Sequence, residues 1–140
     1  MENISYHGTS LTNATKIVGS PNNVDVTLGK GELGQGFYTG TSIALAAIWA
    51  QSRHEGNSAV IKFEISESDF IQLNGHLIKK RNKLKKIWND LIERGTTVTH
   101  KFGYDYVVSP FATVQETGSQ LKFESKKAEK TLNNSKATII

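Results

Sequence analysis

The chain has 140 residues, and its 17 Lys and Arg against 13 Asp and Glu give a formal net charge of +4 with the histidines neutral. This length fits one globular domain, and we do not expect a two-domain architecture. Hydrophobic residues at 37% and charged residues at 21% exclude a wholly disordered or fibrous chain. The lack of cysteine excludes disulfides, thiolate catalysis and cysteine-ligated zinc.

Location and partner class follow from hydropathy and charge. No apolar run approaches the roughly 18 to 20 residues that a membrane span requires. The opening MENISYHGTS lacks the basic-then-apolar layout of a secretory signal, so we expect a cytoplasmic protein with no membrane partner. A pI near 9.3 favours acidic partners such as nucleic acid, nucleotides or an acidic protein.

The first half of the chain predicts strands followed by helices. Residues 4–6 predict a short strand, and apolar spacing over 11–18 predicts a helix with Ser10 as N-cap. Residues 19–36 predict a long loop with one short strand at 24–28, and a loop of this length is a candidate cover for a ligand. GFYTGTS and SIALAAIWAQSR then predict a strand and a helix capped by Ser42. The apolar face of that helix is predicted to contain Ile43, Ala47, Ile48 and Ala50.

The second half continues this mixture. SAVIKFEIS predicts a central strand, and residues 77–93 predict an amphipathic basic helix that Gly95 ends. A strand ending at Pro110, a strand at SQLKFES and a helix at SKKAEKTL follow. The order favours one α+β domain over residues 1–133, with two small sheets that could enclose a cleft, and a tail at 134–140.

Two segments carry candidate chemistry. In Tyr6-His7-Gly8-Thr9, the glycine permits close backbone approach to a ligand and the imidazole can hydrogen-bond a hydroxyl. The alternative is a turn at the end of a strand with a surface histidine. In GQGFYTGTS, Tyr38 could present its ring to a flat heterocycle while Phe37 points to the core, or both could be core aromatics after a glycine-rich turn. Neither segment is a phosphate loop or a dinucleotide fingerprint.

Together these segments resemble the ADP-ribosyltransferase superfamily, in its His-Tyr-Glu branch of poly(ADP-ribose) polymerase-like and small prokaryotic or phage toxin-type domains. The resemblance lies in YHGT, LGQGFYTGTSIALAAIWA, AVIKFEIS, DYVV and SQLKFESKKA. It implies a split β-sandwich of two small sheets with flanking helices around an NAD cleft. The other branch of the superfamily, built on Arg, a Ser-Thr-Ser strand and a Glu-x-Glu loop, fits worse because position 7 is His.

The resemblance also implies roles for single residues. His7 would hydrogen-bond a ribose hydroxyl, the Gly8 backbone would hold the nicotinamide amide, and Tyr38 would stack on the nicotinamide ring. Thr9 would lie near the adenosine ribose, and the loop from Gly19 to Gln35 would partly cover the cofactor. The residues expected to contact NAD are His7, Gly8, Thr9, Gln35, Gly36, Phe37, Tyr38 and Ser42.

The third triad position departs from the family pattern. The resemblance places Gln120 where the family most often has Glu. A glutamine can hydrogen-bond a ribose hydroxyl, but it brings no negative charge to stabilise an oxocarbenium-like ribosyl cation. Glu116 in the preceding loop and Glu124 at the far end of the strand are the two candidates to supply that charge. The expected catalytic set is His7, Tyr38, Gln120 and Glu116, and a member without the glutamate favours single ADP-ribose transfer.

The basic helix is a candidate nucleic-acid site. Its cations could neutralise several phosphates, and the alternatives are a solvated helix face or a patch for an acidic protein. Trp88 shares helical spacing with Leu84 and Leu91, which favours the core over base stacking. The predicted nucleic-acid contacts are Lys79, Lys80, Arg81, Lys83, Lys85 and Lys86.

The sequence therefore predicts an NAD-dependent mono-ADP-ribosyltransferase that acts as a toxin or anti-phage defence effector. Its acceptor is favoured to be nucleic acid, RNA in particular, and otherwise protein, and an antitoxin partner is expected on family analogy. The alternatives are an RNA 2′-phosphotransferase-like enzyme, a non-catalytic module that binds nucleic acid or ADP-ribose, and an NAD hydrolase. No metal is expected, because the four histidines lack ligand spacing.

Overall fold

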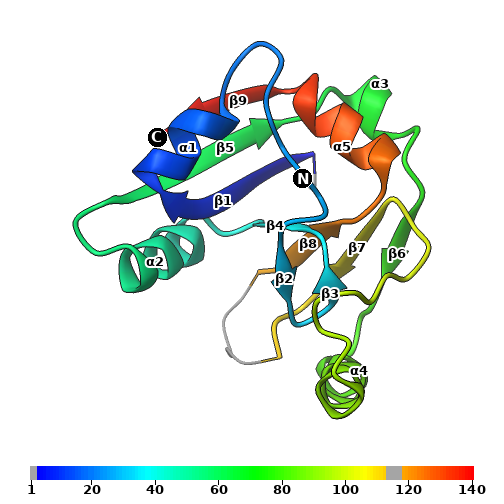
Figure 1. Ribbon diagram of the computed structural model, residues 1–140. Helices are drawn as coiled ribbons and strands as arrows, with labels where there is room; N and C mark the ends of the chain where they lie inside the picture. The colour runs from blue at the N-terminus through cyan, green and yellow to red at the C-terminus, as the bar shows by residue number, and fades with distance from the viewer. Residues whose placement is uncertain (1–2, 113–117) are drawn as a thin grey trace. The chain divides into compact units, whose positions relative to one another are not determined.

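The computed structural model describes residues 3–112 and 118–140 and shows an α+β fold (Figure 1). The prediction of this class is confirmed. In place of two small sheets, the described strands form a mixed seven-stranded sheet, in the order β6-β7-β8-β4-β1-β5-β9, and a two-stranded sheet of β2 and β3. The strands are β1 (Ile4–Ser10), β2 (Lys30–Gly31), β3 (Gly34–Gln35), β4 (Phe37–Gly40), β5 (Ser58–Glu64), β6 (Gly75–Leu77), β7 (Tyr106–Ser109), β8 (Gln120–Phe123) and β9 (Lys136–Ile139). The helices are α1 (Leu11–Ile17), α2 (Ile43–Arg53), α3 (Glu67–Phe70), α4 (Arg81–Arg94) and α5 (Lys126–Asn133).

The chain folds into two compact units, each made of separate stretches of sequence. Unit 1 comprises residues 1–24, 39–72 and 130–140, and unit 2 comprises residues 25–38 and 73–129. Within the described residues no helix is long and apolar enough to cross a membrane.

Antiparallel strands form the sheet of unit 1. β1 pairs with β5 over its full length, from Ile4 opposite Glu64 to Ser10 opposite Ser58. β9 pairs with the other edge of β5, so residues 136–139, which the sequence analysis assigned to a tail, form a strand. The β5 side chains of Ile61 and Phe63 are fully buried, as expected for a β-branched and an aromatic residue in a central strand.

Serine side chains cap both longer helices of unit 1. Ser10 Oγ accepts a hydrogen bond from Asn13 N at 3.0 Å, and Ser42 Oγ accepts one from Leu45 N at 3.2 Å. Each bond satisfies an amide that the first helical turn leaves without a partner. Both predicted N-caps are confirmed.

The predicted buried face of α2 is confirmed for Ala50 and wrong for Ile43, Ala47 and Ile48. Ala46 and Ala50 are buried, whereas Ile43 and Ile48 are 48% and 63% exposed. The reason lies in β1, because a Cβ atom on Gly8 would sit 2.2 Å from the Ala46 carbonyl oxygen. Only small side chains on α2 allow the two backbones to approach this closely, so alanine faces the sheet and isoleucine faces outward.

Unit 2 combines parallel and antiparallel pairing. β6 runs parallel to β7, β7 runs antiparallel to β8, and β2 with β3 forms a short hairpin. Leu84 and Leu91 of α4 are buried, and Trp88 packs against the same apolar cluster, which confirms its predicted place in the core. The cluster consists of Leu33, Ile78, Leu84, Val107 and Ala112.

Two predicted elements of this part of the chain differ from the structure. Residues 24–28 form no strand, because the amides of Val24 and Val26 donate to the Asn133 and Glu129 side chains instead of to a neighbouring strand. The basic helix begins at Arg81, since residues 75–77 pair with β7 as β6. Its predicted end is confirmed by Gly95, whose φ of 67° is left-handed.

Candidate active site

The predicted contacts His7, Gly8, Thr9 and Ser42 belong to unit 1. His7 lies on β1 opposite Ile61 and is half-buried. Gly8 is required by the close approach of α2, independently of any ligand. Thr9 is buried and its hydroxyl accepts a 3.5 Å hydrogen bond from Asn13 Nδ2, while the Ser42 hydroxyl caps α2. The structure thus gives Gly8, Thr9 and Ser42 a task in the fold.

The predicted contacts Gln35, Gly36, Phe37 and Tyr38 belong to unit 2 and lie at the end of β3, at the residue between the strands and at the start of β4. Gln35 Nε2 donates to Thr27 O at 3.1 Å. Gly36 lies against the Lys122 side chain, since a Cβ there would be 2.7 Å from Lys122 Cγ. Phe37 is buried, as predicted for a residue that points to the core.

The Tyr38 side chain is fixed by the β2–β3 hairpin. Its hydroxyl accepts a hydrogen bond from Leu33 N at 3.0 Å and donates one to Gly34 O at 2.6 Å. Gly31 lies against the ring, because a Cβ there would be 2.8 Å from Tyr38 Cζ. Burial raises the pKa of the phenol, and the nearby Glu32 carboxylate raises it further. Tyr38 is therefore a neutral, well-anchored phenol, and its role as a nicotinamide platform stays a prediction.

Gln120, the residue expected at the third triad position, bonds to a carboxylate that the sequence analysis missed. Its side chain is 4% exposed, and Nε2 donates to Glu32 Oε1 at 3.0 Å and to Pro110 O at 3.1 Å. Glu32 Oε1 also accepts a hydrogen bond from Ala112 N at 2.7 Å. The only sequence signal for Glu32 was a lone carboxylate within a glycine-rich loop. Glu32 links Gln120 to the hairpin that holds Tyr38, and we call Glu32, Tyr38 and Gln120 the polar cluster.

Of the two carboxylates considered for the third position, Glu116 lies outside the described residues. Glu124 is described, and its side chain is buried. Glu124 Oε1 is 2.8 Å from Lys122 Nζ and accepts from Phe102 N, while Oε2 accepts from Gly103 N at 2.8 Å. These bonds give Glu124 a structural task and balance its charge.

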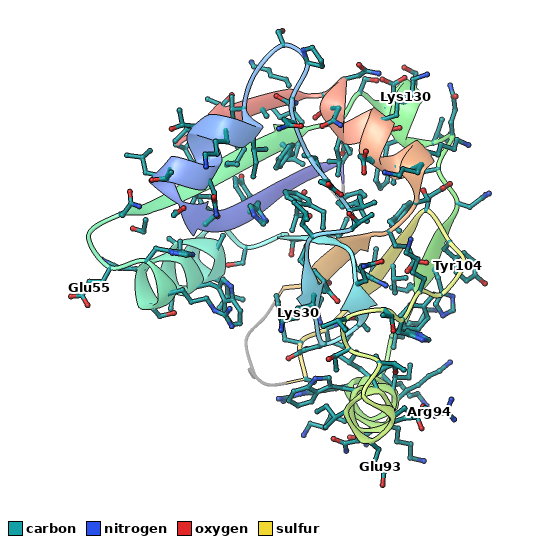
Figure 2. All side chains as sticks on the ribbon, viewed as in Figure 1. Lys30, Glu55, Glu93, Arg94, Tyr104 and Lys130 are labelled. Atoms are coloured by element: carbon teal, nitrogen blue, oxygen red, sulfur yellow. The ribbon has the colours of Figure 1, made fainter. Side chains whose placement is uncertain are left out.

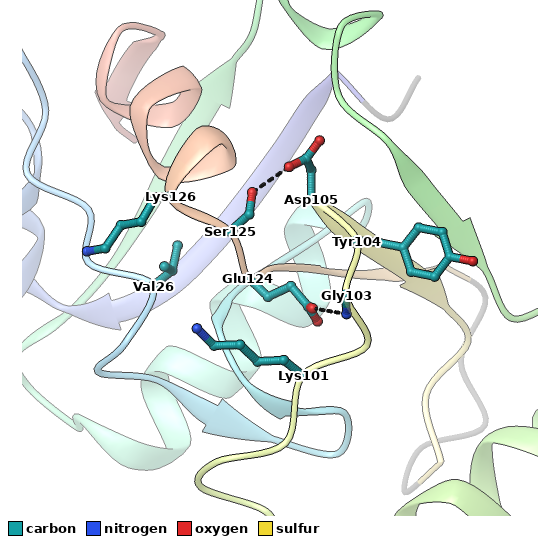
Figure 3. Close-up of a pocket in the computed structure, with 8 residues that line it drawn as sticks. All are labelled: Val26, Lys101, Gly103, Tyr104, Asp105, Glu124, Ser125 and Lys126. Carbon is teal, nitrogen blue, oxygen red and sulfur yellow. Dashed lines mark hydrogen bonds between the residues drawn. The ribbon is translucent and has the colours of Figure 1, made fainter.

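A hollow of about 310 Å³ lies beside Glu124 in unit 2 (Figure 3). Two hydrogen bonds join residues that line it: Ser125 Oγ donates to Asp105 Oδ1, and Gly103 N donates to Glu124 Oε2. Lys101 and Lys126 also line the hollow. Its lining residues are Val26, Lys101, Gly103, Tyr104, Asp105, Glu124, Ser125 and Lys126. None of the predicted NAD contacts lines this hollow.

The predicted nucleic-acid contacts divide into two groups. The five lysines are exposed, and we call them the lysine patch: Lys79, Lys80, Lys83, Lys85 and Lys86. Arg81 instead turns into the unit, where its Nη2 atom donates to Ala112 O at 2.9 Å. No acidic residue lies in the first turn of α4, and Lys80 at the N-cap makes no side-chain cap bond. The positive end of the helix dipole therefore adds to the lysine charges.

An aromatic pair near the lysine patch escaped the sequence analysis. The rings of His76 and Tyr104 are stacked, with centroids 4.8 Å apart and planes at 16°. Tyr104 is 40% exposed and its side chain points outward from unit 2 (Figure 2). His76 is three residues before Lys79, so the Cα atoms of these two residues are at most about 11 Å apart. Stacked aromatics beside lysines are a typical surface for single-stranded nucleic acid.

A scan of the chain against protein-family models finds no match. A search of curated protein sequences likewise finds no match.

Proposed function

We propose that the protein is an NAD-dependent mono-ADP-ribosyltransferase with an ADP-ribosyltransferase-like split β-sandwich fold. One observation supports this most directly: Tyr38 and Gln120, two of the three triad positions, belong to one polar cluster in unit 2. Glu32 accepts a hydrogen bond from Gln120 at 3.0 Å, and the next residue, Leu33, donates its N–H to the Tyr38 hydroxyl at 3.0 Å. A carboxylate held in place beside these two residues can stabilise positive charge on a ribose.

In this proposal His7 hydrogen-bonds a ribose hydroxyl, the Gly8 backbone holds the nicotinamide amide and Tyr38 stacks on the nicotinamide ring. These roles follow the family resemblance. NAD brings a good leaving group, so the protein needs to position the substrate and the acceptor and to stabilise charge at the ribose.

RNA is the proposed acceptor. The lysine patch supports it, because five exposed lysines on one short stretch can contact several phosphates. The outward Tyr104 ring, stacked on His76, offers a face for an unpaired base. On analogy with the family that the sequence resembles, we propose that the protein acts as a toxin or defence effector with a neutralising antitoxin.

The arginines of the chain do not favour the alternative of an RNA 2′-phosphotransferase, which would need basic groups for the phosphate. Arg53 lies over the Trp49 ring at 4.0 Å, Arg81 binds Ala112 O, and Arg94 pairs with Asp90 at 3.1 Å. Each is held by its own unit. A binding module for ADP-ribose or nucleic acid is the second candidate, because the Tyr38 hydroxyl and the Gln120 amide already bond within the protein.

The test uses NAD labelled on its adenylate phosphate, mixed with the purified full chain and a bacterial lysate. We expect label to enter macromolecules, to disappear on RNase treatment and to be lost in the His7→Gln variant. His54→Gln, at the end of α2, is the matched control and should label as the wild type does. Label removed only by protease would replace RNA with protein as acceptor. NAD consumed without label would indicate hydrolysis, and intact NAD would favour the binding module.

A further inference from the structure

We infer that Glu32 supplies the negative charge that Gln120 lacks at the third position of the triad, an inference that rests on the proposed function. In this inference the carboxylate lies in the turn between β2 and β3, whereas the family resemblance places it on strand β8. Gln120 then holds the Glu32 carboxylate by a hydrogen bond, and its presence in place of glutamate does not imply that the enzyme is inactive.

The hydrogen bonds of Gln120 explain why this position holds an amide. Both hydrogens of Nε2 are used, one by Glu32 Oε1 at 3.0 Å and one by Pro110 O at 3.1 Å. A glutamate here would point an acceptor oxygen at two other acceptors in a site that is 4% exposed. Two carboxylates this close would repel each other, whereas the glutamine amide donates a hydrogen bond to Glu32.

The position of Glu32 is fixed by its neighbours along the chain. Ala112 N donates to its Oε1 at 2.7 Å, and the next residue, Leu33, is completely buried. The Tyr38 hydroxyl bonds Leu33 N and Gly34 O on the same turn. A charge held in place before the reaction stabilises a developing cation without reorganisation, which is the requirement for electrostatic catalysis.

No other carboxylate in the described ranges 3–112 and 118–140 bonds to Gln120. Glu124 lies on the same stretch of chain, but the ammonium of Lys122 balances its charge at 2.8 Å. Glu32 is therefore the negative group that the fold brings to position 120.

The transfer step has a simple balance. The bond between the ribose C1′ atom and the nicotinamide nitrogen breaks, and its electron pair leaves with nicotinamide, which becomes neutral. C1′ carries positive charge until an acceptor oxygen or nitrogen donates a lone pair to it, and the acceptor proton passes to water. Glu32 forms no bond and takes no proton; its charge stabilises the cationic ribose.

Removing the carboxylate from position 32, and then placing one at position 120, tests this role. Nicotinamide release from NAD is measured with bacterial RNA and lysate present, and NAD affinity and melting temperature are measured beside it. We expect Glu32→Gln to lower the release rate about 100-fold, with little change in NAD affinity or melting temperature, because the new amide oxygen still accepts from Ala112 N. Glu93→Gln removes an exposed carboxylate that points away from α4 (Figure 2) and should leave all three values unchanged.

The double variant Glu32→Gln with Gln120→Glu exchanges the amide and the carboxylate, so a donor again faces an acceptor between the two positions and only Pro110 O still opposes the charge. We expect it to recover at least about tenfold of the lost rate. A Glu32→Gln protein that releases nicotinamide within about threefold of the wild-type rate would overturn the assignment while leaving the proposed function standing. Loss of rate together with loss of folding, with no recovery in the exchange, would make Glu32 structural. A wild-type chain that neither binds nor cleaves NAD would overturn the proposed function itself.

Discussion

Lys122 Nζ and Glu124 Oε1 are 2.8 Å apart, and their side chains are 0% and 2% exposed. Lys122 also donates to His100 O at 3.1 Å, and the same carbonyl accepts from Gln35 N at 3.0 Å. The buried ion pair therefore holds the segment around His100, which in turn holds the β2–β3 hairpin.

Breaking this pair should destabilise the protein strongly. Lys122→Met leaves Glu124 as a buried unpaired charge, and we expect the free energy of unfolding to fall by about 3–5 kcal/mol. Urea denaturation measures it. Lys126→Met removes an exposed lysine that is 3.4 Å from Glu129, and it should cost less than about 1 kcal/mol. Equal losses of unfolding free energy in the two variants would show that the buried ion pair contributes no more than the exposed one.

The His100 imidazole should make stability depend on pH. Burial lowers its pKa below 6.5, and the Lys122 ammonium lowers it further. The unfolded chain then binds a proton more readily than the folded chain, so the stabilisation is complete above pH 6.5 and is lost as the pH falls through the folded-state value. Denaturation from pH 7.5 to 5.0 should show this fall. In His100→Gln the free energy of unfolding should fall less steeply with decreasing pH. An unchanged slope would show that other groups cause the pH dependence.

The Tyr38 hydroxyl should contribute to stability apart from any ligand. Tyr38→Phe keeps the ring but leaves Leu33 N and Gly34 O without their partner, which should cost about 1–3 kcal/mol. Urea denaturation checks this. Tyr104→Phe removes a hydroxyl from an exposed ring and serves as control with no expected change. A Tyr38→Phe protein as stable as the wild type would contradict the anchoring of the hairpin.

The packing of β1 against α2 should tolerate no side chain at position 8. Gly8→Ala places a Cβ 2.2 Å from the Ala46 carbonyl oxygen, which is backbone and can move only with the helix. We expect a loss of about 1–3 kcal/mol, measured as the free energy of unfolding. Ser58→Ala, an exposed change on β5, is the control. A neutral Gly8→Ala variant would mean that α2 shifts freely.

The lysine patch should bind single-stranded RNA electrostatically. Replacing its five lysines by glutamine should weaken binding and reduce the slope of log K against log salt by about 0.7 for each phosphate that the protein no longer neutralises. Fluorescence anisotropy with a labelled oligonucleotide measures both. Substituting the five exposed lysines 16, 30, 101, 130 and 136 is the control with the same charge change. Equal losses of affinity in both variants would indicate attraction by net charge alone.

Local signals in the sequence predict helix ends well. Ser10, Ser42 and Gly95 act within a turn of their own position, so their caps could be read directly from the chain. The buried face of α2 could not be predicted, because it depends on Gly8 in another element. Strands of two residues, such as β2 and β3, are too short to show a period.

Contacts between distant parts of the chain also limit what the sequence predicts about the candidate site. The family resemblance of the sequence predicts Tyr38 and Gln120 as site residues. Glu32 has no such pattern, and it meets Gln120 across 88 positions of sequence. The stacking of His76 on Tyr104 likewise depends on the parallel pairing of β6 with β7, which brings separate stretches of chain together.

The interleaving of the two units affects how the chain can fold. The chain passes from one unit to the other at residues 24–25, 38–39, 72–73 and 129–130. β9 must find β5 after the whole of residues 73–129 has intervened, which imposes a large loop-closure entropy before the pairing of the two strands can offset it. High contact order of this kind slows folding, and neither unit is a continuous fragment that could be produced by itself.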